Sequence, residues 1–286
     1  MSMRPSSFQY ERAESLQEAL QMLASGDAKA LAGGHSLIPA MNLRLAQPQK
    51  LVDIGRLDEL RQIAADGGSL RIGALTTHAQ IAASADVQEH CPALASAASR
   101  IGDPQVRNWG TLGGNLAHAD PASDPPAVVL AAGATLHLMG PEGQRSVAAD
   151  DFFTGLFETD LKAEELLFAV EIPSLADKAT SYVKLPHPAS RYALVGICVI
   201  LEVEDEECAS ARVAVTGAVP SATRSPAAEL ALAGSRLDED SLSAAAQALM
   251  DELGDDVMDD LHAPRDYRRA MCGVYFKRAV RSALGQ

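Results

Sequence analysis

The chain has 286 residues, 47% of them hydrophobic and 22% charged, and its 24 basic and 38 acidic side chains give a net charge of −14. This composition excludes a disordered chain, and the excess of acidic residues argues against nucleic-acid binding. No apolar run is long enough for a transmembrane span and residues 1–15 lack the apolar core of a secretory signal, so we expect a cytoplasmic protein with no membrane span.

The first part of the chain alternates strands and helices. Apolar residues at helical spacing predict a helix over 15–24, with Ser15 as its N-cap and Glu18 completing a capping box. Further segments are expected as strands at 28–33 and 50–55 and as one or two helical turns at 39–45. The order of these segments predicts a β-α-β subdomain over about residues 1–57, with tight glycine-rich corners.

A second block, over about residues 58–175, mixes strands with helices. We expect a strand at 70–77 to lead into a helix near 78–85, and residues 92–101 to form another helix. Prolines that follow Ser and Asp predict a helix N-terminus within residues 123–133. Three more strands are expected at 134–140, 143–149 and 165–173, with a turn-rich connection at 150–155.

The character of the sequence changes near residue 176. Three strands with a charged hairpin at 204–207 are expected at 181–186, 192–204 and 209–219. Helices are expected at 226–233, 239–253 and 264–283. The fold class is therefore α+β, with a domain over 1–175 made of two subdomains and a C-terminal domain over 176–286, a three-stranded antiparallel sheet with helices.

Two glycine pairs are candidates for binding a ligand. They lie in AGGHS (32–36), after a predicted strand, and in TLGGN (111–115), between short polar side chains. Glycine has no Cβ and reaches positive φ freely, so paired glycines let backbone N–H groups converge on an anion such as a diphosphate. Each pair by itself is also compatible with an ordinary tight turn. Neither is a G-x-G-x-x-G or a P-loop motif, so the residues alone predict only an anion-binding α+β protein.

Metal sites and catalytic residues are not indicated. The cysteines are far apart in the sequence and form no C-x-x-C pair, which argues against an iron–sulfur cluster or a zinc site in this chain; they are Cys91, Cys198, Cys208 and Cys272. No His-x-x-x-His spacing and no paired acid and base are present. Any redox chemistry of this chain must therefore use a bound organic cofactor.

Two longer stretches carry a resemblance to a known family. AGGHSLIPAMNLRLAQP (32–48) and IGDPQVRNWGTLGGNLAHADPASDPPAVVLAAGA (101–134) resemble the FAD-binding medium subunit of molybdenum hydroxylases. That family includes the medium subunit of aerobic carbon monoxide dehydrogenase and the flavin domain of xanthine dehydrogenase. The resemblance implies a two-part FAD-binding region of the vanillyl-alcohol-oxidase/MurB type, followed by a smaller C-terminal domain.

The resemblance also implies which residues contact FAD. Both glycine loops are expected at the diphosphate, Asp124 near the ribityl chain with Asp120 as its neighbour, and Tyr192 over the isoalloxazine ring. Leu167 and Lys184 are expected at the flavin ring and the ribityl end. Core packing would also explain Leu167, a surface strand position Lys184, and an ordinary aromatic seal of the core Tyr192. The loop residues so assigned are Ala32, Gly33, Gly34, His35, Ser36, Thr111, Gly113, Gly114 and Asn115. Trp109 departs from the family pattern and is expected beside the cofactor loop, as packing or as a subunit contact.

By the same resemblance, the chain is an electron-transfer subunit. It would take electrons from the iron–sulfur clusters of a small partner subunit, hold them on FAD and pass them to an external acceptor. Substrate oxidation would occur at a molybdenum–pterin centre in a large partner subunit, and the assembly would be a dimer of heterotrimers. A self-contained flavin-dependent oxidoreductase of related fold and a non-catalytic nucleotide-binding assembly module remain as alternatives. The sequence does not indicate the substrate or the acceptor.

Overall fold

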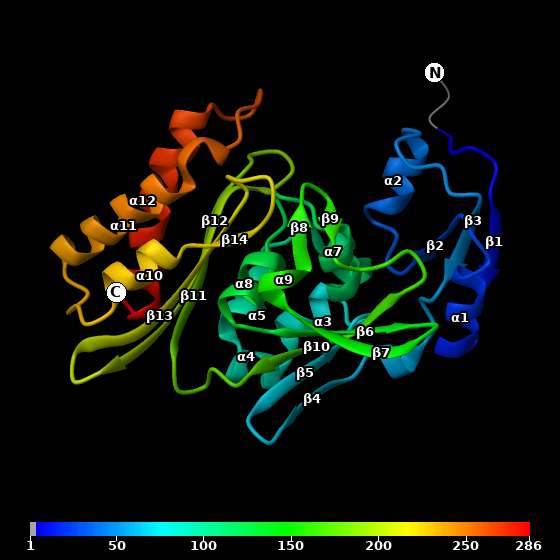
Figure 1. Ribbon diagram of the computed structural model, residues 1–286, viewed down its shortest axis with the longest axis horizontal. Helices are drawn as coiled ribbons and strands as arrows, with labels where there is room; N and C mark the ends of the chain where they lie inside the picture. The colour runs from blue at the N-terminus through cyan, green and yellow to red at the C-terminus, as the bar shows by residue number, and fades with distance from the viewer. Residues whose placement is uncertain (1–3) are drawn as a thin grey trace.

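A computed structural model describes residues 4–286, which form three units in a row along the longest axis of the molecule (Figure 1). Each unit is built around its own β-sheet, and a separate pair of short strands accompanies the middle one. Residues 1–3, with which the predicted N-terminal subdomain begins, lie outside the described residues.

The N-terminal unit is a small parallel sheet with two helices. Its strands run in the order β1-β3-β2 and are β1 (Gln9–Arg12), β2 (Ala28–Leu31) and β3 (Lys50–Asp53), connected by α1 (Leu16–Leu23) and α2 (Leu37–Asn42). Ser15 caps α1 as predicted, by accepting the N–H of Glu18 at 3.1 Å. The other half of the predicted capping box is wrong, because the Glu18 carboxylate accepts the N–H of Glu14 at 2.7 Å.

The middle unit is built on a five-stranded antiparallel sheet in the order β4-β5-β10-β6-β7. Its strands are β4 (Ile63–Asp66), β5 (Ser69–Gly73), β6 (Thr135–Gly140), β7 (Gly143–Ala148) and β10 (Leu166–Pro173), and β8 (Phe153–Gly155) pairs separately with β9 (Glu158–Thr159). Its helices are η1 (Asp58–Leu60), α3 (His78–Ala83), α4 (Ala85–His90), α5 (Pro92–Ser99), α6 (Pro104–Trp109), α7 (Leu112–His118), α8 (Pro125–Ala131) and α9 (Ala149–Phe152). The turn-rich connection expected at 150–155 is instead the end of α9 followed directly by β8.

The C-terminal unit is a four-stranded antiparallel sheet with helices. The sheet order is β11-β12-β13-β14, with β11 (Ala179–Pro186), β12 (Ala193–Glu204), β13 (Glu207–Thr216) and β14 (Thr223–Arg224). The helices are α10 (Pro226–Leu232), α11 (Glu239–Leu253), η2 (Gly254–Asp256) and α12 (Arg265–Ala283). The predicted three-stranded sheet is therefore wrong by one strand, because β14 is too short to show an alternating pattern. None of the helices within residues 4–286 has the length and apolarity needed to cross a bilayer.

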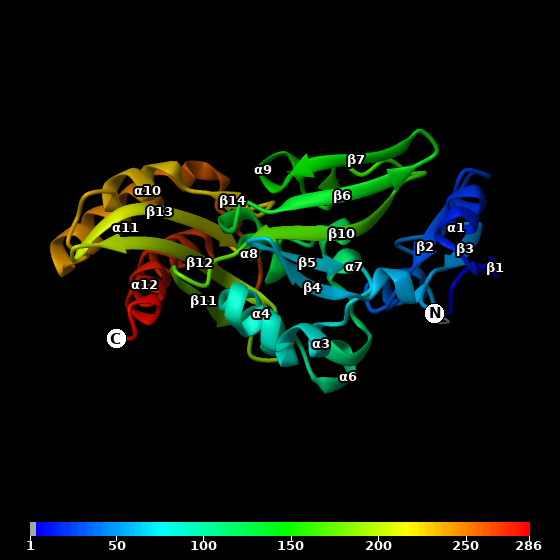
Figure 2. The same ribbon diagram turned by 90° about the horizontal axis from the view of Figure 1, so that it is seen from below.

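Strand β12 packs against two layers, the helices of the C-terminal unit on one face and the middle unit on the other. It is buried on both faces, and its side chains alternate between two hydrophobic clusters. Val195, Ile197 and Val199 pack with helices α10 to α12 on the outer face, whereas Cys198 and Ile200 join the core of the middle unit. Figures 1 and 2 show these helices on the side of the sheet that faces away from the middle unit.

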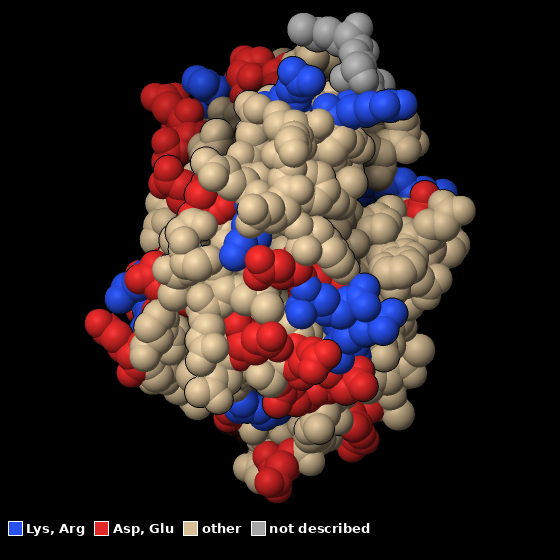
Figure 3. All heavy atoms as spheres, turned by 90° about the vertical axis from the view of Figure 1, so that its right-hand side faces the viewer, with Lys and Arg blue, Asp and Glu red and all other residues tan. Residues whose placement is uncertain are grey.

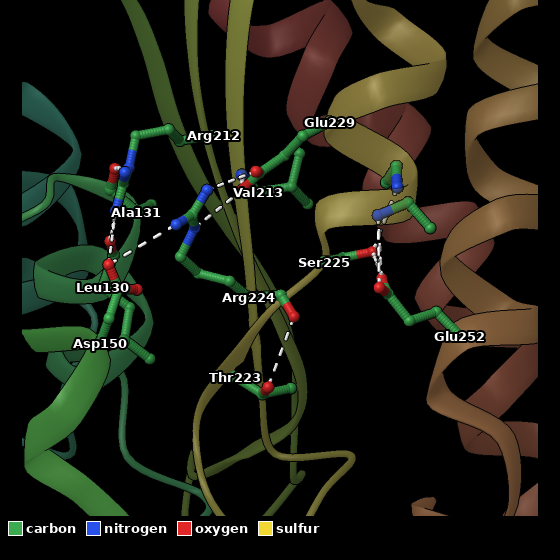
Figure 4. Close-up of polar contacts among 12 residues, drawn as sticks. Leu130, Ala131, Asp150, Arg212, Val213, Thr223, Arg224, Ser225, Glu229 and Glu252 are labelled. Atoms are coloured by element: carbon green, nitrogen blue, oxygen red, sulfur yellow. Dashed lines mark hydrogen bonds and ion pairs between the residues drawn. The ribbon is translucent and has the colours of Figure 1, made fainter.

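The same interface contains a polar network, shown in Figure 4. Arg212 on β13 donates to the carbonyl oxygens of Leu130 and Ala131, at 2.9 and 2.7 Å, and pairs with Asp150 at 3.3 Å. Arg224 on β14 joins Asp150 from the other side at 3.5 Å. The last carbonyl groups of a helix have no partner within the helix, so Arg212 satisfies the C-terminal end of α8 from another unit.

Candidate functional site

A cavity of about 870 Å³ opens where the three units meet. Its wall contains residues 32–37 of the N-terminal unit, residues 110–115 of the middle unit except Leu112, and residues 190–192 of the C-terminal unit. A volume of this size falls in the range of pockets that hold a cofactor-sized ligand. All but two of the residues predicted to contact FAD line it; the exceptions are Asp120 and Lys184.

The first glycine loop, residues 32–36, connects β2 to α2. Gly34 has a φ of +71°, a conformation that favours glycine. Nδ1 of His35 hydrogen-bonds to the carbonyl oxygen of Gly33 at 2.9 Å, so this nitrogen carries the proton. The backbone N–H groups of residues 33–36 donate to no acceptor within residues 4–286. A loop that lines the cavity therefore has four consecutive N–H donors that are unused within the described residues, which suits an anion site.

The second glycine pair is arranged differently from the predicted corner. Gly113 and Gly114 lie in the first turn of α7, which Thr111 caps by accepting the N–H of Gly114 at 3.2 Å. The N–H of Gly113 donates to the carbonyl oxygen of Ala74 at 2.8 Å. The expectation that both glycines offer free N–H groups is therefore wrong, because both donors are already used within the chain.

These two glycines instead allow close packing around the cavity. A Cβ on Gly113 would lie 2.5 Å from the Cβ of Ala74, and one on Gly114 would lie 2.8 Å from Oγ1 of Thr111. The polar side chain that remains for a ligand in this turn is Asn115, whose Oδ1 accepts from the hydroxyl of Ser123 at 2.7 Å. That bond leaves the Asn115 amide N–H groups available as donors.

The two glycine loops meet at Gly33. A Cβ on this residue would lie 1.9 Å from the carbonyl oxygen of Trp109 and 3.1 Å from the Cα of Gly110. The backbone of Trp109 thus lies against the first glycine loop, and the residue is 66% exposed. Only glycine fits at position 33 while the loops keep this separation, so the shape of the cavity depends on this contact.

Asp124 lies at the cavity wall with its carboxylate held from the C-terminal unit. Nζ of Lys184 donates to Oδ2 of Asp124 at 2.7 Å and to the carbonyl oxygen of Arg100 at 3.2 Å, and the Tyr182 hydroxyl donates to Oδ1. Burial raises the pKa of Asp124, while the charge of Lys184 and the bonds from both residues oppose the rise. Burial also raises the pKa of Tyr182, and the adjacent carboxylate adds to this effect. Lys184 therefore stands behind Asp124 and does not line the cavity.

Asp120, Leu167 and Tyr192 occupy three different environments. Oδ1 of Asp120 accepts the N–H of Ala122 at 2.9 Å, so this side chain shapes the loop before α8 and does not line the cavity. Leu167 is buried beside the cavity at a bulge in β10. Tyr192 is 47% exposed at the cavity, and burial followed by the charges of Asp120 and Asp124 raises its pKa.

Two features of the cavity wall were not predicted as ligand contacts. His78, the first residue of α3, lines the cavity with 2% of its surface exposed. Phe157, between β8 and β9, packs against His118 with ring centroids 5.2 Å apart. A single histidine at a helix start or a single phenylalanine between two short strands carries no motif, so only the folded chain reveals these positions. Within residues 4–286, no cluster of His, Cys, Asp and Glu is arranged to hold a metal ion.

Comparison with known proteins accounts for nearly the whole chain. A family profile described as the FAD binding domain in molybdopterin dehydrogenase matches residues 6–175, and one for the CO dehydrogenase flavoprotein C-terminal domain matches residues 180–283. The carbon monoxide dehydrogenase medium chain of Hydrogenophaga pseudoflava is 39% identical over 284 residues, or 98% of each chain. The nicotine 6-hydroxylase medium subunit of Paenarthrobacter nicotinovorans is 35% identical over 279 residues, 97% of this chain and 98% of the relative.

A solved structure agrees with these matches. Carbon monoxide dehydrogenase from Hydrogenophaga pseudoflava, in a form that lacks the Mo-pyranopterin moiety, superposes with a TM-score of 0.95 at 40% identity, covering 98% of both chains. The fold and the site therefore define a flavoprotein subunit of a molybdenum-containing oxidoreductase, with FAD as its cofactor. The chain belongs to the family of FAD-binding medium subunits of molybdenum dehydrogenases and hydroxylases, which confirms the resemblance seen in its motifs.

Proposed function

We propose that this chain carries electrons through FAD from the iron–sulfur clusters of a small partner subunit to an external acceptor. The observation that carries the proposal is the meeting of the two glycine loops at one cavity, where Gly33 lies against Trp109. A cavity of about 870 Å³ that both loops line is large enough for one long ligand to contact both. The proposed binding mode is that of the vanillyl-alcohol-oxidase/MurB type.

The residues of the cavity fit the charged diphosphate, the ribityl hydroxyl groups and the flavin ring of FAD. The free N–H groups of residues 33–36 supply donors for the negatively charged diphosphate. The Asn115 amide adds a neutral donor, and the Asp124 carboxylate offers an acceptor for ribityl hydroxyl groups. We assign Leu167 and Tyr192 to the flavin ring, which needs apolar and aromatic neighbours, and Lys184 to the support of Asp124.

FAD, when bound, supplies the redox chemistry by accepting electrons and releasing them to an acceptor. The chain's own residues bind and orient the cofactor, and no catalytic acid or base is assigned to them. Substrate oxidation falls to the proposed large molybdenum–pterin subunit. Relatives named medium chain or medium subunit imply larger and smaller partners, and we propose the same assembly here, as a dimer of heterotrimers.

The surface near the first loop supports an assembly with partner subunits. Leu43 and Leu45, which follow α2, and Trp109, whose backbone contacts Gly33, are 58%, 79% and 66% exposed, as apolar side chains at a subunit interface would be before assembly. The face at the N-terminal end of the molecule shows a broad uncharged area in its upper half, with acidic side chains mainly below it and along one edge (Figure 3). The four cysteines are all free and buried, in agreement with the proposed cytoplasmic location.

Native purification tests the proposal. We expect a yellow-brown complex of three different subunits that contains FAD, molybdenum and iron and oxidises a substrate with an added electron acceptor. The measurements are a visible spectrum, subunit masses and metal content. A yellow chain that purifies alone and turns over substrate without partners would overturn the proposal in favour of a self-contained flavin oxidoreductase. A colourless chain in a complex without flavin would overturn it in favour of an assembly module.

A further inference from the structure

A buried histidine stands at the point where the two glycine loops meet. His78 begins α3, and its backbone N–H donates to the carbonyl oxygen of Gly110 at 3.0 Å. Its ring packs on the same residue, because Cδ2 and Nε2 lie 2.9 and 3.2 Å from where a Cβ on Gly110 would be. Gly110 in turn adjoins Gly33 of the first loop. The His78 side chain therefore lines the cavity beside both loops.

Nδ1 of His78 is fully buried and has no hydrogen-bond partner within residues 4–286. Two other histidines of the middle unit are paired: His137 bonds to Ser146 and Glu171 at 2.9 and 3.1 Å, and His90 bonds to Ser174 at 2.8 Å. Buried polar groups nearly always have partners, since an unpaired one loses its hydration without compensation. A ligand cannot reach Nδ1, but Nε2 of His78 also has no hydrogen-bond partner within residues 4–286 and is not fully buried, so it is the ring nitrogen open to a ligand of the cavity.

The charge state of the ring suits this role. Burial, together with the nearby His35, lowers the pKa of His78 to about 4, so the imidazole is neutral at physiological pH. A neutral imidazole carries one N–H donor and one acceptor nitrogen. The diphosphate and the ribityl chain of FAD are rich in oxygen acceptors, and hydroxyl groups of the ribityl chain are also donors.

We propose that His78 is a further FAD-binding residue, whose Nε2 hydrogen-bonds to the cofactor where the two glycine loops meet. The inference rests on the proposed function only in taking FAD as the ligand of the cavity. It adds a side chain from the start of α3 to a site otherwise built from residues 32–36, residues 111–115 and the loop that ends at Asp124.

FAD titration of matched variants tests this role. The native complex is stripped of flavin and titrated with FAD, and the Kd is measured from flavin fluorescence. His78→Leu, which keeps the bulk and removes both nitrogens, is expected to raise the Kd about tenfold, the usual effect of losing one buried hydrogen bond. His78→Gln, which keeps a donor and an acceptor, is expected to stay within about threefold of wild type. Ile81→Val is the control, because Ile81 is buried on the same helix but does not line the cavity.

A measurement on the wild-type complex does not depend on how the variants fold. Hydrogen–deuterium exchange at the imidazole C2 position, followed by mass spectrometry, is compared with and without FAD. Exchange at His78 is expected to slow several-fold with FAD, while His90, which lies outside the cavity, stays unchanged. Equal exchange at His78 in both states, or equal weakening of FAD by His78→Leu and Ile81→Val, would overturn the inference. Failure of the wild-type complex to take up FAD would instead overturn the proposed function.

Discussion

At the scale of single residues, Gly33 shows most directly how sequence sets the shape of the site. Gly33→Ala places a methyl group on the Trp109 carbonyl, so the two loops must move apart. We expect a loss of stability of about 1–3 kcal/mol, typical of overpacking, and loss of most bound flavin. Flavin absorbance per protein and urea denaturation measure the two effects. Gly26→Ala is the matched control: it strains a positive φ but meets no atom within 4 Å and should keep its flavin.

His78 gives a second residue-scale prediction, for the dependence of stability on pH. Its pKa is about 4 in the folded chain against 6.5 ordinarily, so the unfolded chain binds a proton that the folded chain does not bind over this range. The contribution of His78 to the unfolding free energy is therefore fully present above pH 6.5. It is lost as the pH drops toward 4, which lowers the unfolding free energy by up to about 3 kcal/mol. Unfolding free energies at pH 7 and pH 4.5 should differ more for flavin-free wild type than for His78→Gln. Parallel pH profiles would contradict the prediction.

The binding residues themselves were only partly predictable from sequence. The motifs placed the Gly33–Gly34 pair correctly at the end of a strand, although that strand ends at Leu31 and not at Gly33 as predicted, and the free N–H groups there agree with the chemistry expected of paired glycines. The same reasoning failed at Gly113 and Gly114, because their N–H groups are used by Ala74 and Thr111. Backbone donors are claimed by neighbours that the sequence does not reveal.

At the scale of elements, α8 connects the cavity to the C-terminal sheet. Asp124 precedes its first turn at the cavity, and Arg212 satisfies the carbonyl groups at its other end. Arg212→Met leaves those carbonyls and Asp150 without this partner, and we expect a loss of about 1–3 kcal/mol in urea denaturation. Arg236→Met is the control, since this exposed side chain pairs with Glu207 only at 3.8 Å and should change stability by less than about 0.5 kcal/mol. Equal effects of the two variants would show that Arg212 has no special role.

Helices and strands were predictable from the sequence where the hydrophobic periodicity and the capping residues indicate the same bounds. Helix α11 has the predicted bounds, 239–253, because Asp238 caps a long amphipathic repeat. Strand β1 was missed because its pairing is with β3, about forty residues further along the chain, and its own four residues show no alternation. Helix α7 was missed because the two glycines in its first turn are typical of a tight turn outside a helix.

At the scale of the whole molecule, the C-terminal unit holds the loop that ends at Asp124. The N–H groups of Ala193 and Gly217 donate to the carbonyl oxygens of Ala122 and Pro121, at 3.1 and 2.7 Å. Oγ1 of Thr216 lies 2.8 Å from the carbonyl oxygens of both Pro121 and Ser123. Because these contacts come from strand ends of another unit, this part of the cavity takes its shape only when the C-terminal sheet is docked.

Two threonines of the C-terminal sheet allow this dependence to be tested with the same substitution. The Thr216 hydroxyl bonds to the loop that ends at Asp124, whereas the Thr180 hydroxyl is buried without a partner within residues 4–286. Thr216→Val leaves the carbonyl oxygen of Ser123 without this donor, while that of Pro121 keeps the N–H of Gly217, so we expect a loss of about 1–3 kcal/mol and a weaker affinity for FAD. Thr180→Val removes an unpaired hydroxyl and should be neutral or slightly stabilising, with unchanged FAD affinity.

Hydrogen exchange of the backbone in the purified complex locates the effect. Thr216→Val should speed exchange in residues 119–124, while residues 32–36 keep their wild-type rates without flavin, because the first glycine loop has no contact with Thr216 among the hydrogen bonds of the described chain. Thr180→Val should leave both segments unchanged. If Thr216→Val instead unfolded the chain without first loosening residues 119–124, the C-terminal sheet would contribute general stability alone. A local rise in exchange, together with weaker FAD binding, would mean that a domain with few residues in the cavity decides how tightly the cavity holds its cofactor.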